Sequence, residues 1–251
     1  MFPRKDNGRF NMINVVLVGA CGKMSSAVVS SLVNEKDIKI IGGIEAAGHP
    51  LIGQPIGKGF IQTNISSIIK DADVIVEFAI PEITSDNLKI AAQAKIPYII
   101  GTTGYKDIAY IKNYAEKIPI LMSANFSLGI NLMFQLTETA TKALKNFDIE
   151  IIEAHHKMKR DAPSGTAKKL AEIIKEVGNK KREVNVHSIR AGDIVGEHNV
   201  MFIGNGERIE LIHRATSRNA FASGVTKAIR FIVNQKPRFY GMEDLISFKR
   251  I

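Results

Sequence analysis

The segment Glu153–Ala167, with the sequence EAHHKMKRDAPSGTA, concentrates side chains that are suited to chemistry. Two adjacent imidazoles, His155 and His156, stand beside several cations, among them Lys159. An imidazole can take up and release a proton near neutral pH, and cations stabilise carboxylates. The segment therefore favours a site that binds an acidic substrate and moves a proton. The alternative is a solvated basic turn in front of a capped helix.

The elements on either side of this segment explain how it would be positioned. Residues 149–152 are mostly apolar and predict a buried strand, whereas apolar positions in residues 168–177 recur at helical spacing. The segment is then a strand end, a loop and a helix start, where a rigid scaffold can hold reactive groups. Ser164 or Thr166 can cap the helix, and its free N–H groups suit an anion such as a carboxylate.

The beginning of the chain has the order of elements that dinucleotide binding requires. A predicted strand at 13–18 leads into Gly19-Ala20-Cys21-Gly22-Lys23-Met24, a helix to about residue 34, and a strand at 38–44 that ends at Glu45. Gly19 permits the tight turn, Gly22 lets the backbone approach a pyrophosphate, and Glu45 can accept from ribose hydroxyls. The alternative is a strand, turn and helix without a ligand.

Predicted strands and helices keep alternating up to residue 126, which indicates an α/β fold with a doubly wound parallel, Rossmann-type sheet. The predicted strands are 73–78, 97–100 and 118–122, and the predicted helices are 82–94 and 111–117. Ligands of such sheets bind beyond the carboxyl ends of the strands. The loops at 79–81, 101–104 and 123–126 should therefore share an edge with the Gly19 turn.

A second α+β domain with an open mixed sheet is predicted after residue 126, because the pattern changes there. A helix is expected up to about residue 145, and the strands of this sheet at 184–189, 200–203 and 208–213. A last helix is expected at 219–234, followed by a short tail at 242–248.

The composition limits the class of protein and its partners. The chain has 251 residues, 45% of them hydrophobic and 24% charged, with a net charge of +9, as expected for a soluble globular protein. The basic charge is spread along the chain, without a Lys/Arg block and interleaved aromatics, so a polyanionic small ligand is expected rather than nucleic acid. No membrane span and no metal are expected. Cys21 is the single cysteine, which favours a reducing, cytoplasmic location. Residues 1–12 are expected to be a disordered extension.

Five motifs occur in the order found in bacterial dihydrodipicolinate reductases, also called 4-hydroxy-tetrahydrodipicolinate reductases. They are residues 153–167, 101–104, 123–127, 190–198 and 217–218, and the resemblance covers nearly everything from Ile13 onward. The resemblance implies reduction of 4-hydroxy-tetrahydrodipicolinate with NADH or NADPH, in lysine and diaminopimelate biosynthesis. It also implies a homotetramer built through the second domain's sheet, a dinucleotide-binding domain of residues 13–126 and 219–251, and a substrate-binding and oligomerisation domain of residues 127–218.

The resemblance also implies roles for individual residues. His155 would be the catalytic acid or base, and Lys159 the proton donor. The substrate carboxylates would be held by His156, Gly165, Thr166 and Arg218. The cofactor contacts would fall on Gly19, Ala20, Cys21, Gly22, Lys23, Met24, Glu45, Gly101, Thr102, Thr103, Ser123, Ala124, Asn125 and Phe126.

Two departures from the family pattern concern the cofactor. Ser25 stands where a glycine is usual, and Ala46 stands where some members carry an arginine beside the acid. Glu45 without that arginine favours NADH, because a 2′-phosphate would meet like charge. Lys23 or Lys58 could still reach such a phosphate, so the sequence is compatible with use of both NADH and NADPH.

Two other classes of protein share parts of this pattern. A related dehydrogenase acting on aspartate or an amino-acid semialdehyde is the nearest alternative, but a version that oxidises an aldehyde would need a cysteine nucleophile in the second domain. Cys21 lies in the predicted phosphate turn instead. A nucleotide-binding regulator would have no need of the imidazole and lysine cluster around His155.

Overall fold

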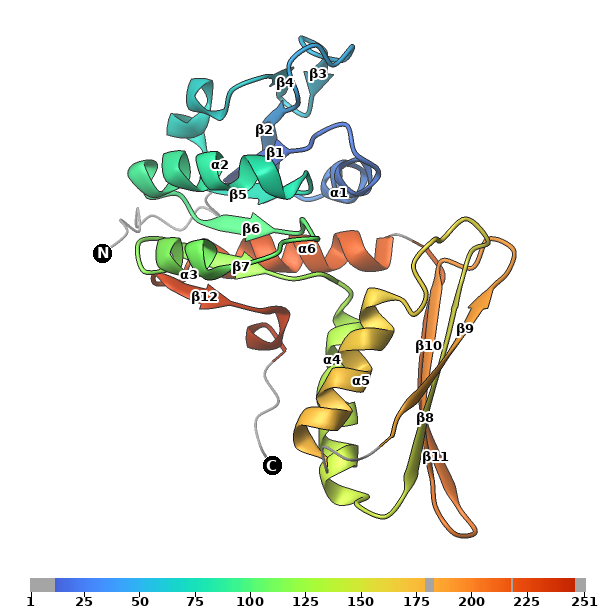
Figure 1. The fold of residues 1–251 in the computed structure, drawn as a ribbon. Helices are drawn as coiled ribbons and strands as arrows, with labels where there is room; N and C mark the ends of the chain where they lie inside the picture. The colour runs from blue at the N-terminus through green and yellow to red at the C-terminus, as the bar shows by residue number, and fades with distance from the viewer. Residues whose placement is uncertain (1–11, 179–182, 218, 247–251) are drawn as a thin grey trace. The chain divides into compact units, whose positions relative to one another are not determined.

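The computed structural model in Figure 1 describes residues 12–178, 183–217 and 219–246. The chain divides into two compact units, one of Met1–Ile120 with Ile229–Phe239 and the other of Leu121–Ala228 with Tyr240–Ile251. All of the predicted N-terminal extension except Met12 lies outside the described residues, as does Arg218.

The first sheet has eight strands in the order β12-β7-β6-β5-β1-β2-β4-β3. Its central strands are β1 (Ile13–Val18), β2 (Ile38–Ile44), β5 (Val74–Glu77), β6 (Tyr98–Ile100) and β7 (Pro119–Met122). β1 pairs in parallel with β2 on one side and β5 on the other, and β5 pairs in parallel with β6. These three strands follow the order β1, β2, β5 along the chain, but in the sheet β1 lies between β5 and β2. This reversal of the strand order is typical of a doubly wound sheet. The predicted Rossmann-type architecture is confirmed.

The strands of this sheet are buried on both faces, which explains their continuous apolar runs. Residues 15–18 of β1 are fully buried, as are residues 98–100 of β6. The helices that connect the strands are α1 (Lys23–Leu32), α2 (Pro81–Ala94) and α3 (Ala109–Ala115), and a further helix, α6 (Asn219–Ile232), comes late in the chain. α2 starts at Pro81, where the missing N–H costs no helical bond.

Several short strands and turns were not predicted from the sequence. They are β3 (Pro55–Ile56), β4 (Gly59–Gln62), β12 (Arg238–Tyr240) and the 3₁₀ turns η1 (Ile65–Ser67), η2 (Ile69–Asp71) and η3 (Met242–Asp244). β3 and β4 form an antiparallel hairpin that extends the sheet beyond β2. These strands have two to four residues, too few for an alternating pattern to stand out from a loop.

The second sheet has four strands in the order β11-β10-β8-β9, and Figure 1 shows it beside two long helices. The strands are β8 (Asp148–His155), β9 (Asn185–Arg190), β10 (Gly196–Ile203) and β11 (Arg208–Ala215), and the helices are α4 (Leu128–Ala143) and α5 (Gly165–Val177). β10 is antiparallel to both of its neighbours, whereas β8 and β9 are parallel. The predicted mixed sheet is therefore confirmed.

One face of the second sheet packs on α4 and α5, and the other face carries no helix among the described residues. The packed face includes Ile151, Val200 and Phe202, which form a core with Leu170 and Ile174 of α5. Because side chains alternate along a strand, the neighbours of these core residues point to the opposite face of the sheet.

Candidate active site

β8 brings two titratable side chains to the packed face of the second sheet. Glu153 and His155 alternate with Ala154, so they lie on the same face as buried Ile149 and Ile151. Glu153 is fully buried, and only 8% of His155 is exposed. Burying an ionisable group without hydrogen-bond or ion-pair partners costs free energy. The contacts of these two side chains therefore indicate what stabilises the site.

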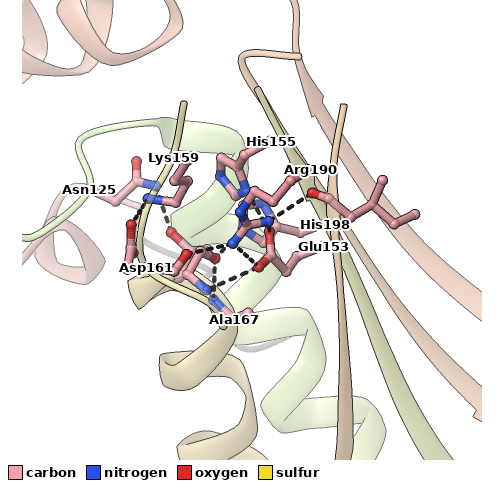
Figure 2. Close-up of polar contacts among 11 residues, drawn as sticks. Asn125, Glu153, His155, Lys159, Asp161, Ala167, Arg190 and His198 are labelled. Atoms are coloured by element: carbon pink, nitrogen blue, oxygen red, sulfur yellow. Dashed lines mark hydrogen bonds and ion pairs between the residues drawn. The ribbon is translucent and has the colours of Figure 1, made fainter. Parts of the chain in front are cut away.

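The carboxylate of Glu153 is the centre of a hydrogen-bonded cluster (Figure 2). Arg190 donates to both of its oxygens, at 2.9 and 2.7 Å, and Nδ1 of His155 lies 2.5 Å from Oε2. The backbone N–H of Ser164 donates to Oε1 at 3.1 Å. Burial alone would raise the pKa of Glu153, but the hydrogen bonds from Arg190, Ser188, His155 and Ser164 outweigh it and lower the pKa to about 2. Glu153 is therefore ionised.

The loop after β8 is fastened to the same cluster. Nη2 of Arg190 donates to the carbonyl oxygen of Asp161 at 2.6 Å. The carboxylate of Asp161 in turn pairs with Nζ of Lys159 at 2.8 Å, which lowers the pKa of Asp161 chiefly through that hydrogen bond. The backbone N–H of Lys159 donates to the carbonyl of His156 at 3.0 Å. Lys159 is thus held in a turn whose far end is bound by Arg190.

His155 is uncharged near neutral pH. Burial lowers its pKa below the ordinary value, and the charges of Lys159 and Arg190 lower it further, whereas Glu153 raises it. Nδ1 faces a carboxylate that only accepts, so Nδ1 carries the proton and Nε2 presents a lone pair. A Cβ at Gly196 would lie 3.1 Å from Nε2, so a side chain there would crowd this nitrogen.

The predicted helix cap lies directly beside this cluster. Ser164 is the N-cap of α5, and its Oγ accepts from the N–H of Ala167 at 3.2 Å, so the predicted capping by Ser164 is confirmed. The same Oγ lies 3.2 Å from Nε2 of His198, a buried residue of β10. Burial, followed by the nearby His155, lowers the pKa of His198 to about 3.

Several residues that the resemblance implied for ligand binding also belong to the second unit. Thr166 lies in the first turn of α5, and its Oγ1 accepts from Nδ2 of Asn125 at 3.2 Å. A predicted substrate residue and a predicted cofactor residue are therefore in contact. Gly165 precedes Thr166, and the space around its Cα is open. The predicted substrate residue Arg218 lies outside the described residues.

The glycine turn of the first unit has the geometry that a pyrophosphate requires. Gly19 has a φ of +73°, and a Cβ there would lie 2.3 Å from the carbonyl oxygen of Phe78. Gly22 is the N-cap of α1 and provides no side-chain bond, so the first N–H groups of the helix remain available to an anion. Ser25, which replaces the usual glycine, is buried and donates to the carbonyl of Gly19 at 2.7 Å.

Glu45 lies in a cavity of about 890 Å³ together with Gly19 and Gly22. Its carboxylate accepts from the backbone N–H groups of Cys21 and Ala46, both at 3.1 Å, which fixes it beside the turn. The cavity thus combines free helix N–H groups with an oriented carboxylate, a set that fits the pyrophosphate and ribose of a nicotinamide cofactor.

Two lysines that were considered as partners of a 2′-phosphate lie in different places. Lys58 is in the turn between β3 and β4, where its N–H donates to Ile40, and it lines a separate hollow. Lys23 is the first residue of α1. Lys89 of α2, which was not considered, lines the cavity that contains Glu45.

Glu77 was also missed, although it orders the edge where a cofactor would bind. It is fully buried at the end of β5 and accepts from Tyr98 at 2.7 Å and from Thr102 at 3.1 Å. Thr102 in turn accepts from the N–H of Ala79 at 3.0 Å. Glu77 therefore ties the exits of two neighbouring strands, and Thr102 was itself a predicted cofactor residue.

Glu153, Arg190 and His198 were not predicted as functional residues, although all three lie in motifs that carried the resemblance. A signal for Glu153 was present, because the alternation of Ile149, Ile151 and Glu153 puts it on the core side. His198 alternates in the same way with Val200 and Phe202. No comparable signal locates Arg190, since its contacts depend on how β9 pairs with β8.

The described part of the chain contains neither a metal-binding cluster nor a membrane-spanning helix. Within residues 12–178, 183–217 and 219–246, His, Cys, Asp and Glu side chains form no group of three that could hold a metal ion. In the same ranges, no helix has the length and apolar character needed to cross a membrane.

Solved structures of two other proteins share the fold of this chain. The probable dehydrogenase of Thermotoga maritima has the same fold, with a TM-score of 0.63 and 10% identity over 93% of this chain and 92% of that chain. The aspartate dehydrogenase of Thermotoga maritima is more distant, with a TM-score of 0.51 and 16% identity over 90% and 98%. At these identities the likeness concerns the fold.

The chain belongs to the dihydrodipicolinate reductase family. The N-terminal model of that family matches residues 13–126, and the C-terminal model matches residues 129–246. The 4-hydroxy-tetrahydrodipicolinate reductase of Aquifex aeolicus is 39% identical over 94% of this chain and 99% of its own length. That of Methanocaldococcus jannaschii is 38% identical over 96% and 99%. The resemblance stated above is confirmed.

A solved structure of a relative agrees with this assignment. The dipicolinate-bound dihydrodipicolinate reductase of Paenisporosarcina sp. TG-14 has a TM-score of 0.82 and 26% identity, covering 94% of this chain and all of that chain. Members of the family are NAD(P)H-dependent reductases, so the chain is an oxidoreductase. The alternatives of an aspartate dehydrogenase and a nucleotide-binding regulator are not favoured.

Proposed function

We propose that this chain reduces 4-hydroxy-tetrahydrodipicolinate to tetrahydrodipicolinate with NADH or NADPH, in the biosynthesis of lysine and diaminopimelate. The observation that carries the proposal is the cluster of Glu153, His155, Lys159 and Arg190 beside the N-terminus of α5, in a chain that the family models match along nearly all of its described length.

The start of α5 is proposed to bind a carboxylate of the substrate. Ser164 caps the N–H of Ala167, so the N–H groups of Gly165 and Thr166 have no partner within the helix. Such groups, with the hydroxyl of Thr166, suit a carboxylate oxygen. His156 and Arg218 are proposed to serve the substrate carboxylates as well. The relative from Paenisporosarcina binds dipicolinate, which is a planar dicarboxylate.

His155 and Lys159 are proposed to handle the proton. A nicotinamide cofactor, when bound, supplies the hydride. The substrate loses its hydroxyl group as water, which leaves an unsaturated ring carbon conjugated with the imine. Hydride addition to that carbon moves electrons toward the ring nitrogen, so the adjacent carbon must then be protonated. Lys159, held by Asp161, is positioned as the donor, and His155 acts as acid or base through Nε2. The cations around them stabilise the charge that develops on the ring.

The cofactor is proposed to bind to residues of the Gly19–Met24 turn, to Glu45, and to the strand exits at 101–103 and 123–126. In this proposal, residues 13–126 and 219–251 form the dinucleotide-binding domain, and residues 127–218 bind the substrate and form the oligomer. Support comes from the cavity shared by Gly19 and Glu45, and from family models that meet between residues 126 and 129.

A homotetramer is proposed to form through the open face of the second sheet. Ile189 of the edge strand β9 and Ile212 of the edge strand β11 point to this face and are each 47% exposed, which is high for large apolar side chains. Met201 and Ile152 lie between them on the central strands. A cytoplasmic location is also proposed, on the basis of the single cysteine and the biosynthetic names of the relatives.

Cofactor oxidation with freshly generated 4-hydroxy-tetrahydrodipicolinate tests the proposed function. The purified chain should oxidise NADH or NADPH only when that substrate is present, and mass spectrometry should identify tetrahydrodipicolinate. A chain that binds the cofactor but never oxidises it with this substrate would require another substrate.

A further inference from the structure

We infer that Glu153 and Arg190 form a positioning pair for the reaction, which fixes the reactive nitrogen of His155 and the loop that carries Lys159. The inference rests on the proposed role of His155, and it assigns functions to two residues outside the proposed substrate and cofactor contacts.

The carboxylate oxygens of Glu153 are occupied by hydrogen-bond donors, so Glu153 does not contact the substrate. Oε2 accepts from His155 Nδ1 and from Nη1 of Arg190, and Oε1 accepts from Nη2 of Arg190 and from the N–H of Ser164. Each oxygen therefore has at least two donors, and the side chain is fully buried. A carboxylate in this state can orient its neighbours, but it has no free lone pair directed at a substrate.

Arg190 connects the pair to the loop. It is the register partner of His155 across the parallel strands β8 and β9, so its side chain enters on the same face. Nη1 donates to the carbonyl of Ile189 at 2.8 Å, and Nη2 donates to the carbonyl of Asp161 at 2.6 Å. The planar guanidinium thus serves one carboxylate and two carbonyls at once, which a lysine ammonium on a flexible stem cannot reproduce.

The loop between β8 and α5 is held by this pair at its end. Arg190 binds the carbonyl of Asp161, and Glu153 binds the N–H of Ser164, three residues further on. Asp161 also forms the ion pair with Lys159. The position of the proposed proton donor therefore depends, through Asp161, on the same two side chains that orient His155.

The pair also determines which nitrogen of His155 is available. Its surroundings comprise Glu153 from its own strand, Arg190 from β9, Lys159 from the loop, and the ring of His198 from β10, whose centroid is 5.3 Å away. Among these groups only the Glu153 carboxylate bonds to Nδ1, and it keeps the proton there. A glutamine at 153 could offer an N–H to Nδ1 and favour the opposite tautomer, as happens when the aspartate of a serine-protease triad becomes asparagine.

A purely structural role is the competing explanation, since buried ion pairs also occur for stability. The two explanations differ when both charges are removed together. Glu153→Gln alone leaves the Arg190 charge buried without its partner, which destabilises a fold, whereas replacing both members with neutral groups is often tolerated. The double variant Glu153→Gln/Arg190→Gln therefore separates folding from catalysis.

The experiment measures kcat, the KM for each substrate, NADH affinity and the thermal midpoint for Glu153→Gln, for the double variant and for wild type. We expect the double variant to regain most of the thermal stability lost in Glu153→Gln, but to keep a kcat lowered by about a hundredfold, on the scale of general acid–base catalysis. NADH affinity should be unchanged. In Glu153→Gln the acidic limb of the pH profile of kcat/KM should move to lower pH, because Glu153 raises the pKa of His155. The double variant should show a smaller shift in the same direction, because the Arg190 charge lowers that pKa by less than Glu153 raises it.

Glu150→Gln is the matched control. Glu150 lies on the same strand and accepts from Nε2 of His187 at 2.7 Å, but on the opposite face of the sheet. Its removal should leave kcat and the pH profile at wild-type values, measured at equal oligomeric state. Glu153→Asp, which keeps the charge, should recover part of the activity and the wild-type pH profile.

His155→Gln separates this inference from the proposed function. If His155→Gln loses activity while the double variant keeps wild-type kcat and pH profile, the positioning role of the pair is wrong and the role of His155 stands. If His155→Gln itself has wild-type activity, the proposed role of His155 fails first, and the inference fails with it.

Discussion

Oγ of Ser164 and Nε2 of His198 are hydrogen-bonded at 3.2 Å, and this bond joins the N-cap of α5 to the middle of the second sheet. A similar bond of 3.2 Å joins Ser127, the N-cap of α4, to His213 on β11. His198 and His213 are register partners on adjacent strands. A buried imidazole and a half-buried one therefore fix the starts of both helices that cover the sheet.

The first prediction concerns the stability of the fold as a function of pH. Burial lowers the pKa of His198 to about 3, from an ordinary value of about 6.5. As the pH falls through about 6.5, the unfolded chain takes up a proton at this residue and the folded chain does not. The free energy of unfolding should therefore decrease from about pH 6.5 toward pH 3. Burial lowers the pKa of His155 and His213 as well, so they add to the effect.

Urea unfolding of wild type and His198→Gln between pH 7 and 5 checks this prediction. Glutamine can still bond to Ser164 but does not titrate, so the variant should lose less stability over this range than wild type. Equal slopes for wild type and His198→Gln would rule out His198 as a source of the acid sensitivity.

The second prediction concerns catalysis. His155→Ala and Lys159→Ala should each lower kcat by about a hundredfold or more, the usual scale of general acid–base catalysis. NADH binding, followed by fluorescence, should survive in both variants, because neither residue belongs to the Glu45 cavity. Lys157→Ala is the control, since Lys157 is an exposed cation of the same loop. Near-normal turnover in both variants would refute the assignment.

The third prediction concerns substrate affinity. Thr166→Val and Arg218→Ala each remove a donor proposed to face a carboxylate, and such a charge-assisted bond contributes about 1.5–3 kcal/mol. Dipicolinate, as a stable probe, should bind more weakly by roughly 10- to 150-fold, while NADH affinity stays level. Thr139→Val, at an exposed threonine of α4, should bind dipicolinate normally. Unchanged affinity in both test variants would mean that the carboxylates are bound elsewhere.

The fourth prediction concerns the choice of cofactor. NADH should be used at least as efficiently as NADPH, because the carboxylate of Glu45 would repel a 2′-phosphate. Glu45→Ala should shift the ratio of kcat/KM toward NADPH by removing that repulsion. Ala46→Arg should shift it in the same direction by adding a phosphate partner. A wild-type enzyme that strongly prefers NADPH, with no response to either change, would show that Lys23 or Lys89 reads the phosphate.

Much of the fold could be predicted from the sequence, because buried parallel strands have long apolar runs. β1 and β2 have the bounds that were predicted, and α5 starts at the predicted serine cap. β12 was not predicted, because it has only three residues and pairs with β7, which lies far away in the chain.

The site was only partly predictable for a similar reason. His155 and Lys159 could be predicted because their residue types stand out within one segment. The glycine turn and Glu45 could be predicted because they follow a local order of strand, turn, helix and strand. Glu153 and Arg190 are 37 residues apart, and they meet only because β9 pairs in parallel with β8 in one register. A shift of one residue would turn Arg190 to the other face. Sequence patterns do not specify that register.

The most direct test of the proposed function is the transfer of deuterium from cofactor to product. The purified enzyme is incubated with freshly generated 4-hydroxy-tetrahydrodipicolinate and with NADH deuterated at the transferable position of the nicotinamide ring. The tetrahydrodipicolinate formed should carry a single deuterium on a ring carbon, in a one-to-one ratio with oxidised cofactor, and His155→Ala should slow this transfer. Product without deuterium, or cofactor oxidised without this product, would contradict the proposed reaction.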